Sequence, residues 1–267
     1  MQSRPWQRHY DWNVPETIKY PRIMAHELLG ISVNAFPDKA ATNFFGTELT
    51  FWELRNQILR MAHALGEAGV RKGDRVGVHL PNCPQYIISY YASLFLGAIV
   101  VNLNPMYTVD ELKGLTTNTT VSTLITFDMV LPNIRALCQE VEIERVIVTR
   151  VTDYIDGFGL STPEEMELEE GWQHFSSMLE ASTKTNLPKV EMSVNDPALI
   201  QFTGGTTGLP KGAVLTHANL VAGTMACSLW GSAFTGLTPP EKRSVMAVLP
   251  YFHVYGTIVV LNWGMFN

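Results

Sequence analysis

The chain has 267 residues, which is enough to bury a substantial core as one large domain or two smaller ones. Hydrophobic residues make up 46% and charged residues only 16%, and this composition excludes a disordered chain and favours segments buried on both faces. The net charge is −6 and no block of lysine and arginine stands out, so nucleic-acid binding is not expected.

Cysteine usage and the N-terminus bear on the compartment. Cys83, Cys138 and Cys227 are far apart and odd in number, so they predict neither a metal site nor a disulfide framework. Met1 to Tyr20 contains no apolar core of a signal peptide. We therefore expect a cytoplasmic protein, and peripheral membrane contact stays open.

Residues 1–45 are an N-terminal segment that we call the approach segment, and we expect one helix within it, near 23–35. Thr50 and Glu53 form a capping box, and the helix that they open carries apolar residues at helical spacing until Gly69 ends it. A strand is expected over 75–80.

The uncharged stretch from Val76 to Val109 allows two interpretations. A transmembrane helix needs about 20 apolar residues, and 86–103 comes close. We favour a buried helix over 84–96 and a buried strand over 99–102, because Gly97 breaks the run and β-branched residues follow it.

Alternating helices and strands continue to residue 149. A capping box at Thr108 and Glu111 opens a short helix, and we expect a strand over 122–126, a helix over 131–139 and a strand over 145–149. This alternation predicts an α/β fold with mostly parallel sheets and flanking helices.

The pattern is interrupted between 151 and 194. Five glutamates fall between Glu164 and Glu170, which indicates a solvated acidic excursion rather than a binding tail. A helix over 172–182 and a linker over 186–196 are expected. We divide the chain into an approach segment (1–45), a first α/β subdomain (46–194) and the start of a second (195–267).

The second subdomain begins with short strands over 198–202 and 213–215. Thr216 is expected to cap a helix over 217–230, followed by a strand over 244–249 and an apolar helix from about His253. The chain ends directly after the apolar run 258–266, so we expect a fragment of a longer protein.

The segment Thr203 to Gly212 packs four glycines and three threonines between two strands. Glycines let backbone N–H groups approach an anion, threonine hydroxyls add ligands, and Lys211 adds a charge for phosphate oxygens. The string differs from a Walker A loop because Pro210 precedes the lysine, and from a dinucleotide fingerprint because no helix follows directly.

Three stretches together resemble one family. They are Phe202-Thr-Gly-Gly-Thr-Thr-Gly-Leu-Pro-Lys-Gly-Ala213 continuing to Leu220, Leu249-Pro-Tyr-Phe-His-Val-Tyr-Gly256, and Leu96-Gly-Ala98 with Asn102, Asn104-Pro105 and Glu111-Leu112. The first resembles the signature loop of the adenylate-forming superfamily, and its Thr-Gly-Gly variant is similar to bacterial long-chain fatty-acid–CoA ligases. The resemblance runs from about Ile23 to the end of the chain, roughly half of the family's length.

The resemblance implies a nucleotide site made of Thr203, Gly204, Gly205, Thr206, Thr207, Gly208 and Lys211, with Thr203 on Mg²⁺. It implies ATP and coenzyme A as further reactants, and a fatty acid or other carboxylate as substrate. A carboxylate would attack the α-phosphorus of ATP, and a thiol would then displace AMP. The adenine site and the catalytic lysine of the family would lie beyond residue 267, so the chain alone is expected to be inactive.

His253, Tyr251 and Tyr255 have two interpretations. They match the family motif whose histidine shapes the acyl site, and they also suit ordinary packing of aromatic residues. Two alternatives to a fatty-acid–CoA ligase remain: another adenylate-forming ligase, such as an aryl-CoA ligase or a peptide-synthetase domain, and a catalytically silent nucleotide or acyl binder. The oligomeric state is left open.

Overall fold

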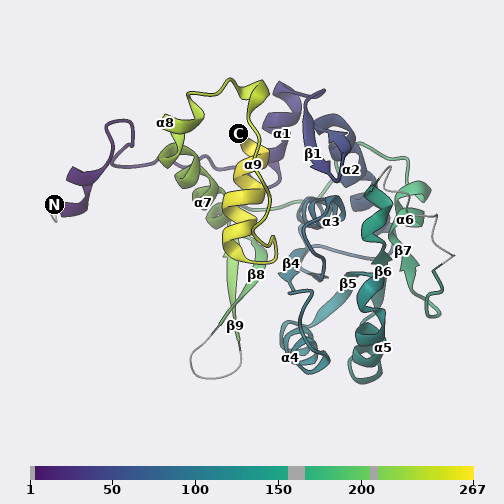
Figure 1. The fold of residues 1–267 in the computed structure, drawn as a ribbon. Coiled ribbons are helices and arrows are strands. Elements are labelled where there is room, and N and C mark those ends of the chain that lie inside the picture. Colours follow the sequence, from purple (N-terminus) through teal and green to yellow (C-terminus); the bar gives the residue numbers. More distant parts are fainter. Residues whose placement is uncertain (1–3, 156–165, 205–209) are drawn as a thin grey trace.

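The structure, a computed structural model, describes residues 4–155, 166–204 and 210–267. Its centre is a seven-stranded sheet in the order β7-β6-β5-β3-β4-β8-β9 (Figure 1). All neighbouring strands are parallel except β8 and β9, which form an antiparallel hairpin. The predicted α/β class is therefore confirmed. The strands are β3 Arg75–Val78, β4 Ile99–Asn102, β5 Val121–Phe127, β6 Arg145–Thr149, β7 Gln173–His174, β8 Pro197–Thr203 and β9 Lys211–Thr216.

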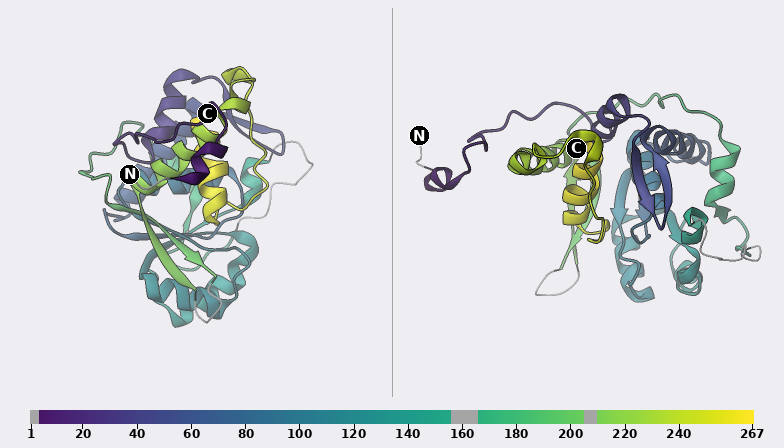
Figure 2. Two further views of the ribbon diagram at one scale, coloured as in Figure 1. Left: turned by 90° about the vertical axis from the view of Figure 1, so that its left-hand side faces the viewer. Right: turned by 45° about the horizontal axis from the view of Figure 1, so that its top comes forward.

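Helices cover both faces of this sheet, as expected for parallel strands joined by crossovers. One hydrophobic cluster joins α1, α2, α3, α6 and α7 to one face, and a second joins α4 and α5 to the other (Figures 1 and 2). The helices are α1 Glu27–Ala35, α2 Phe51–Glu67, α3 Pro84–Phe95, α4 Val109–Thr119, α5 Leu131–Glu140, α6 Phe175–Ala181, α7 His217–Trp230, α8 Ser232–Thr235, a π-helix η5 Gly256–Asn262 and α9 Trp263–Phe266.

Alternation along the strands explains their apolar runs. In β4, Val100 belongs to the first cluster and Val101 to the second, because successive side chains of a strand point to opposite faces. Both faces are covered, so both positions need apolar residues. Gly77 leaves room on the second face, where an added Cβ would lie 3.1 Å from Leu103 and Leu124.

The predicted capping boxes are present and begin α2 and α4. The hydroxyl of Thr50 accepts from the backbone N–H of Glu53 at 3.1 Å, and that of Thr108 accepts from Glu111 at 3.4 Å. Thr216 caps α7 in the same way, with Asn219 taking the place of the usual glutamate or glutamine.

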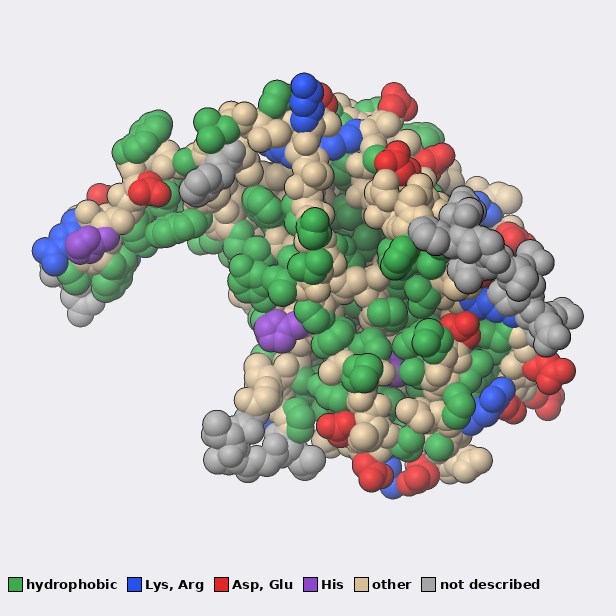
Figure 3. Space-filling model, in the orientation of Figure 1, with side chains coloured by type: hydrophobic (Ala, Val, Ile, Leu, Met, Phe, Trp, Pro, Cys, Tyr) green, Lys and Arg blue, Asp and Glu red, His purple; other side chains and the backbone are tan. Residues whose placement is uncertain are grey.

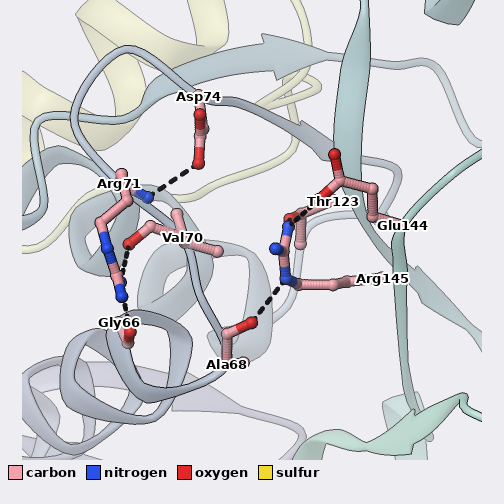
Figure 4. Close-up of polar contacts among 8 residues, drawn as sticks. All are labelled: Gly66, Ala68, Val70, Arg71, Asp74, Thr123, Glu144 and Arg145. Carbon is pink, nitrogen blue, oxygen red and sulfur yellow. Dashed lines mark hydrogen bonds and ion pairs between the residues drawn. The ribbon is translucent and has the colours of Figure 1, made fainter.

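Two arginines hold the C-terminal end of α2 (Figure 4). Nη1 of Arg71 donates to the carbonyl of Gly66 at 2.5 Å, and Nε of Arg145 donates to the carbonyl of Ala68 at 2.6 Å. Cations at this end satisfy unpaired carbonyls and complement the helix dipole. Gly69 follows with φ +102°, so the helix ends where the sequence predicted.

The uncharged stretch forms a buried helix and a buried strand, as favoured above. Pro84 to Leu94 of α3 are buried, and Gly97 (φ +68°) separates this helix from β4. Among the helices in the described part of the chain, none has the length and hydropathy needed to cross a bilayer.

Three local predictions were incomplete or wrong. Residues 244–249 form no strand, and Met246 among them is 82% exposed. The expected helix over 172–182 begins only at Phe175, because Gln173 and His174 pair with β6. A hairpin of β1 Ala40–Phe44 and β2 Thr47–Thr50 was not predicted; its turn holds Phe45 and Gly46 at positive φ.

The seven-stranded sheet continues across residue 195, since β8 pairs with β4 through Val100 and Leu199. The division into a first and a second subdomain near this residue stays a prediction. The N-terminal segment forms an arm that runs past α7 (Figures 1 and 2), where Tyr10 meets the ring of Trp230 edge-on at 5.2 Å.

Candidate functional site: the phosphate hairpin and the aromatic turn

The ends of the predicted phosphate loop are the two strands of the β8–β9 hairpin. Thr203 pairs with Lys211, and Oγ1 of Thr203 donates to the carbonyl of Lys211 at 3.3 Å. Both residues are exposed, as is Gly204. The predicted site residues Gly205, Thr206, Thr207 and Gly208 lie outside the described residues, and their roles stay predictions.

Two glycines flank the loop in different surroundings. Among the residues that the structure describes, none has an atom within 4 Å of a Cβ added to Gly204. A Cβ on Gly212 would lie 2.9 Å from Cγ2 of Ile200 on the opposite strand. Gly212 therefore serves the packing of the hairpin.

The second element of the site, which we call the aromatic turn, comprises residues 250–255 (Pro250 to Tyr255). It leads directly into the π-helix η5. Gly256 lets the two segments meet, because a Cβ there would lie only 1.9 Å from the carbonyl oxygen of Pro250. π-helices often occur at functional sites, because the wider turn displaces side chains from ordinary helical positions.

The three predicted acyl-site residues differ in their surroundings. Tyr251 is buried, its ring lies 5.3 Å from that of Tyr86, and burial raises the pKa of its hydroxyl to about 12. His253 is exposed, and its Nδ1 accepts from the backbone N–H of Tyr255 at 3.2 Å. Tyr255 is 54% exposed. Tyr251 thus belongs to the packed core, while His253 and Tyr255 are free to meet a ligand.

The hairpin and the aromatic turn meet on one face of the sheet. Gln201 and Thr203 lie two residues apart in β8, so their side chains share a face. Nε2 of Gln201 donates to the carbonyl of Phe252 at 2.9 Å. The aromatic turn therefore lies over the same face as Thr203 and its cross-strand partner Lys211.

A groove of ≈ 910 Å³ is lined in part by Asn82, Tyr251, Val260 and Met265. Hydrophobic side chains gather over the middle of the face drawn in Figure 3, and acidic side chains lie around its periphery. This distribution agrees with the low charge content of the chain.

Sequence reasoning did not assign a role to the buried and half-buried polar residues that contact the aromatic turn. Gln201 in β8, Asn82 before α3 and Thr257 in η5 all hydrogen-bond to backbone atoms of the turn or of the residues before it. The signal was present: Gln201 interrupts the apolar run from Ala198 to Phe202, and Asn102 ends the apolar run of β4. Buried amides are retained where they have partners.

The α/β fold and this pairing of a hairpin with an aromatic turn agree with the resemblance of the sequence to the adenylate-forming superfamily. The family model described as "AMP-binding enzyme" matches residues 31–267. The chain belongs to this family.

Curated relatives refine the comparison. The chain is 36% identical to a long-chain-fatty-acid–CoA ligase of Bacillus subtilis over 99% of its own length and 49% of the relative's. It is 31% identical to a crotonobetaine/carnitine–CoA ligase of Salmonella enteritidis, over 87% of this chain and 42% of the relative. The chain therefore spans about half the length of the curated relatives that it matches.

Solved structures agree on the fold. A long-chain-fatty-acid–CoA ligase from Archaeoglobus fulgidus superposes with a TM-score of 0.75 and 25% identity, over 96% of this chain and 47% of that one. An anthranilate–CoA ligase in complex with anthranoyl-AMP gives 0.76 with 22% identity, over 92% of this chain and 43% of that one.

The described residues fit the nucleotide that the family name implies. Thr203 offers a hydroxyl and Lys211 an ammonium, which are suitable partners for phosphate oxygens. The described ranges contain no cluster of three acidic, histidine or cysteine ligands for a metal. Mg²⁺ is usually bound by substrate phosphates, waters and one or two carboxylates, so the role of the Thr203 hydroxyl as a metal ligand stays a prediction.

Proposed function

We propose that the protein to which this chain belongs is an ATP-dependent acid–thiol ligase that activates a fatty acid to an acyl-adenylate and transfers it to coenzyme A. The observation that carries the proposal is the meeting of Thr203, Lys211 and the aromatic turn on one face of the sheet. The names of the fatty-acid–CoA ligase relatives support the choice of substrate.

In this proposal the chain supplies binding and orientation. Lys211 and the loop from Thr203 to Gly208 hold the β- and γ-phosphates, so that the carboxylate can attack the α-phosphorus in line while pyrophosphate leaves. His253 and Tyr255 line the approach of the carboxylate. Bound Mg²⁺ supplies charge neutralisation, and positioning with electrostatic stabilisation provides most of the rate in such transfers.

The second candidate is another adenylate-forming ligase. The crotonobetaine/carnitine–CoA ligase relative favours it, because its similarity to this chain is close to that of the fatty-acid ligases. A catalytically silent nucleotide or acyl binder is the third. We further propose a cytoplasmic protein; peripheral membrane contact and oligomer formation are compatible with the proposal and form no part of it.

The test is carboxylate-dependent exchange of labelled pyrophosphate into ATP, measured on the reading frame expressed to its natural stop codon. Acetate, octanoate, palmitate and coumarate serve as acids. We expect exchange with octanoate or palmitate, and a loss of 100-fold or so on Lys211→Ala, since one charged contact to a transition state is commonly worth about that much. Lys189→Ala removes an exposed lysine before β8 and is the matched control.

Each result has a definite meaning. Exchange with coumarate alone would favour the aryl-CoA ligase alternative. Absence of exchange with every acid, in a folded protein that still binds ATP, would leave the silent binder as the better account. Equal losses on Lys211→Ala and Lys189→Ala would remove the phosphate hairpin from the mechanism.

A further inference from the structure

Two buried amide side chains lie side by side at the junction of β4 and β8. Asn102 is 2% exposed and Gln201 is 6% exposed. Nδ2 of Asn102 donates to Oε1 of Gln201 at 3.0 Å. Parallel pairing of the two strands through Val101 and Ile200 brings these next residues together.

The hydrogen bonds run in one direction from the core to the aromatic turn. The hydroxyl of Thr257 donates to the carbonyl of Tyr251, so it can only accept from Asn102, and this determines which side carries the amide nitrogen that also faces Gln201. Oδ1 of Asn102 in turn accepts from the hydroxyl of Tyr86 at 2.7 Å. Gln201 then accepts through Oε1 and donates through Nε2 to the carbonyl of Phe252 at 2.9 Å. A backbone carbonyl can only accept, so the orientation of the Gln201 amide is determined at both ends.

The neighbouring carbonyl, that of Tyr251, is held by the same set of polar side chains. The hydroxyl of Thr257 donates to the carbonyl of Tyr251 at 2.6 Å, and Asn102 reaches the hydroxyl of Thr257 at 3.2 Å. Two successive carbonyls of the aromatic turn are therefore fixed by side chains that originate in β4, β8 and η5. The residue directly after them is His253.

We propose that Gln201 is a positioning residue that couples the phosphate hairpin to the aromatic turn and thereby sets where His253 and Tyr255 meet the carboxylate substrate. Gln201 lies two residues before Thr203 on the same face of β8. A shift of the nucleotide-binding end of this strand is therefore transmitted to the turn through one hydrogen bond. The inference rests on the proposed function, because it assigns a role within that site.

Burial explains why an amide is needed at this position. An apolar side chain would pack equally well in the strand, but it would leave the Phe252 carbonyl and the Asn102 amide without their partner, and an unsatisfied buried polar group is unfavourable. Glutamate has the same shape and lacks the donor. Gln201→Glu therefore changes one hydrogen bond and the charge, and leaves the size of the side chain unchanged.

The experiment compares Gln201→Glu with Gln85→Glu in the reading frame expressed to its natural stop codon. Gln85 is also a buried glutamine whose Nε2 donates to a backbone carbonyl, that of Arg150 at 2.7 Å, but it lies outside the phosphate hairpin and the aromatic turn. We expect Gln201→Glu to raise the KM for the carboxylate about tenfold or more in pyrophosphate exchange and to change the KM for ATP by less than about threefold. Gln85→Glu should change neither by more than about twofold.

A second readout does not depend on activity. Hydrogen exchange followed by mass spectrometry should show lost protection in peptides covering 249–257 for Gln201→Glu, and unchanged protection there for Gln85→Glu. Gln201→Met, which removes the donor without adding charge, should give a smaller effect of the same kind. This variant replaces Gln201→Glu if the latter does not fold.

Two results would overturn the inference. One is wild-type carboxylate KM and wild-type protection of 249–257 in both Gln201 variants; the other is an equal response of these quantities to Gln85→Glu. If the wild-type protein shows no exchange with any acid, the proposed function fails, while the hydrogen-exchange comparison still decides whether Gln201 holds the turn.

Discussion

Gly256 shows how a single residue shapes the site. It stands where the aromatic turn enters η5, and the carbonyl oxygen of Pro250 occupies the space that a side chain would need, at 1.9 Å from an added Cβ. Backbone cannot withdraw from such a contact as the end of a flexible side chain can. The residue therefore permits the close return of the chain onto the turn.

We predict that Gly256→Ala lowers the free energy of unfolding by about 1–3 kcal/mol, the usual range for overpacking a filled site. Urea unfolding followed by far-ultraviolet circular dichroism measures the change. Gly30→Ala is the control. Gly30 lies within α1, and among the described residues no atom lies within 4 Å of an added Cβ. This substitution should therefore stabilise the protein by about 0.5–1 kcal/mol through helix propensity. Equal effects of the two substitutions would contradict this account.

At the scale of elements, α2 depends on its first turn. Thr50 and Glu53 satisfy each other's backbone N–H groups, with Glu53 accepting from the N–H of Thr50 at 2.8 Å. The backbone N–H and the hydroxyl of Thr50 both donate to the Glu53 carboxylate and hold its pKa below the usual value. The helix contributes Leu54, Ile58 and Leu65 to the core, so its beginning affects the packing of the whole layer.

Thr50→Ala should lower the stability of the protein by about 1 kcal/mol, because the N–H of Glu53 loses its acceptor. Thr50→Ser keeps a hydroxyl and should stay within about 0.5 kcal/mol of wild type. The shift of the urea midpoint at pH 7 measures both. A midpoint for Thr50→Ala that matches the serine variant would show that the box adds nothing here.

At the scale of the whole molecule, buried histidines connect the fold to pH. Burial lowers the pKa of His26 to about 3, and that of His79 and His217 to about 4. In the unfolded chain the same imidazoles titrate near pH 6.5. Below that pH the unfolded state binds more protons than the folded state, so the stability is fully present above pH 6.5 and is lost as the pH falls toward 4.

We predict that the free energy of unfolding falls between pH 7 and pH 5, with each such histidine adding a slope of up to about 1.4 kcal/mol per pH unit. Urea unfolding at half-unit intervals gives the slope. The ring of His26 lies 4.3 Å from that of Phe95, and a phenylalanine ring would occupy the same place. His26→Phe should therefore reduce the slope of the free energy of unfolding against pH. His9→Asn changes an exposed histidine and should leave this slope unaltered. A free energy of unfolding of the wild type that does not change between pH 7 and pH 5 would refute the prediction.

Much of the fold could be predicted from local pattern. The capping boxes at Thr50 and Thr108, the apolar runs of β4 and β6 and the ending of α2 at Gly69 depend on neighbouring residues, and the structure confirms them. The strand expected over 244–249 is absent because strand formation depends on a partner distant in the sequence, and not on neighbouring residues alone. A strand is stabilised by hydrogen bonds to a neighbour, and within the described residues none pairs with this segment.

The candidate site likewise has a part that the sequence predicted and a part that depends on the tertiary structure. The glycine- and threonine-rich string, together with two further stretches, predicted the family that the family model confirms, and it predicted Thr203 and Lys211 as phosphate contacts, because the approach of backbone to phosphate favours those residue types in sequence. Only the tertiary structure decided that Tyr251 is buried while His253 is exposed, and that Gln201 and Asn102 hold the aromatic turn. Residues 102, 201 and 252 are far apart in the chain, and their meeting depends on which strands pair, which local sequence does not encode.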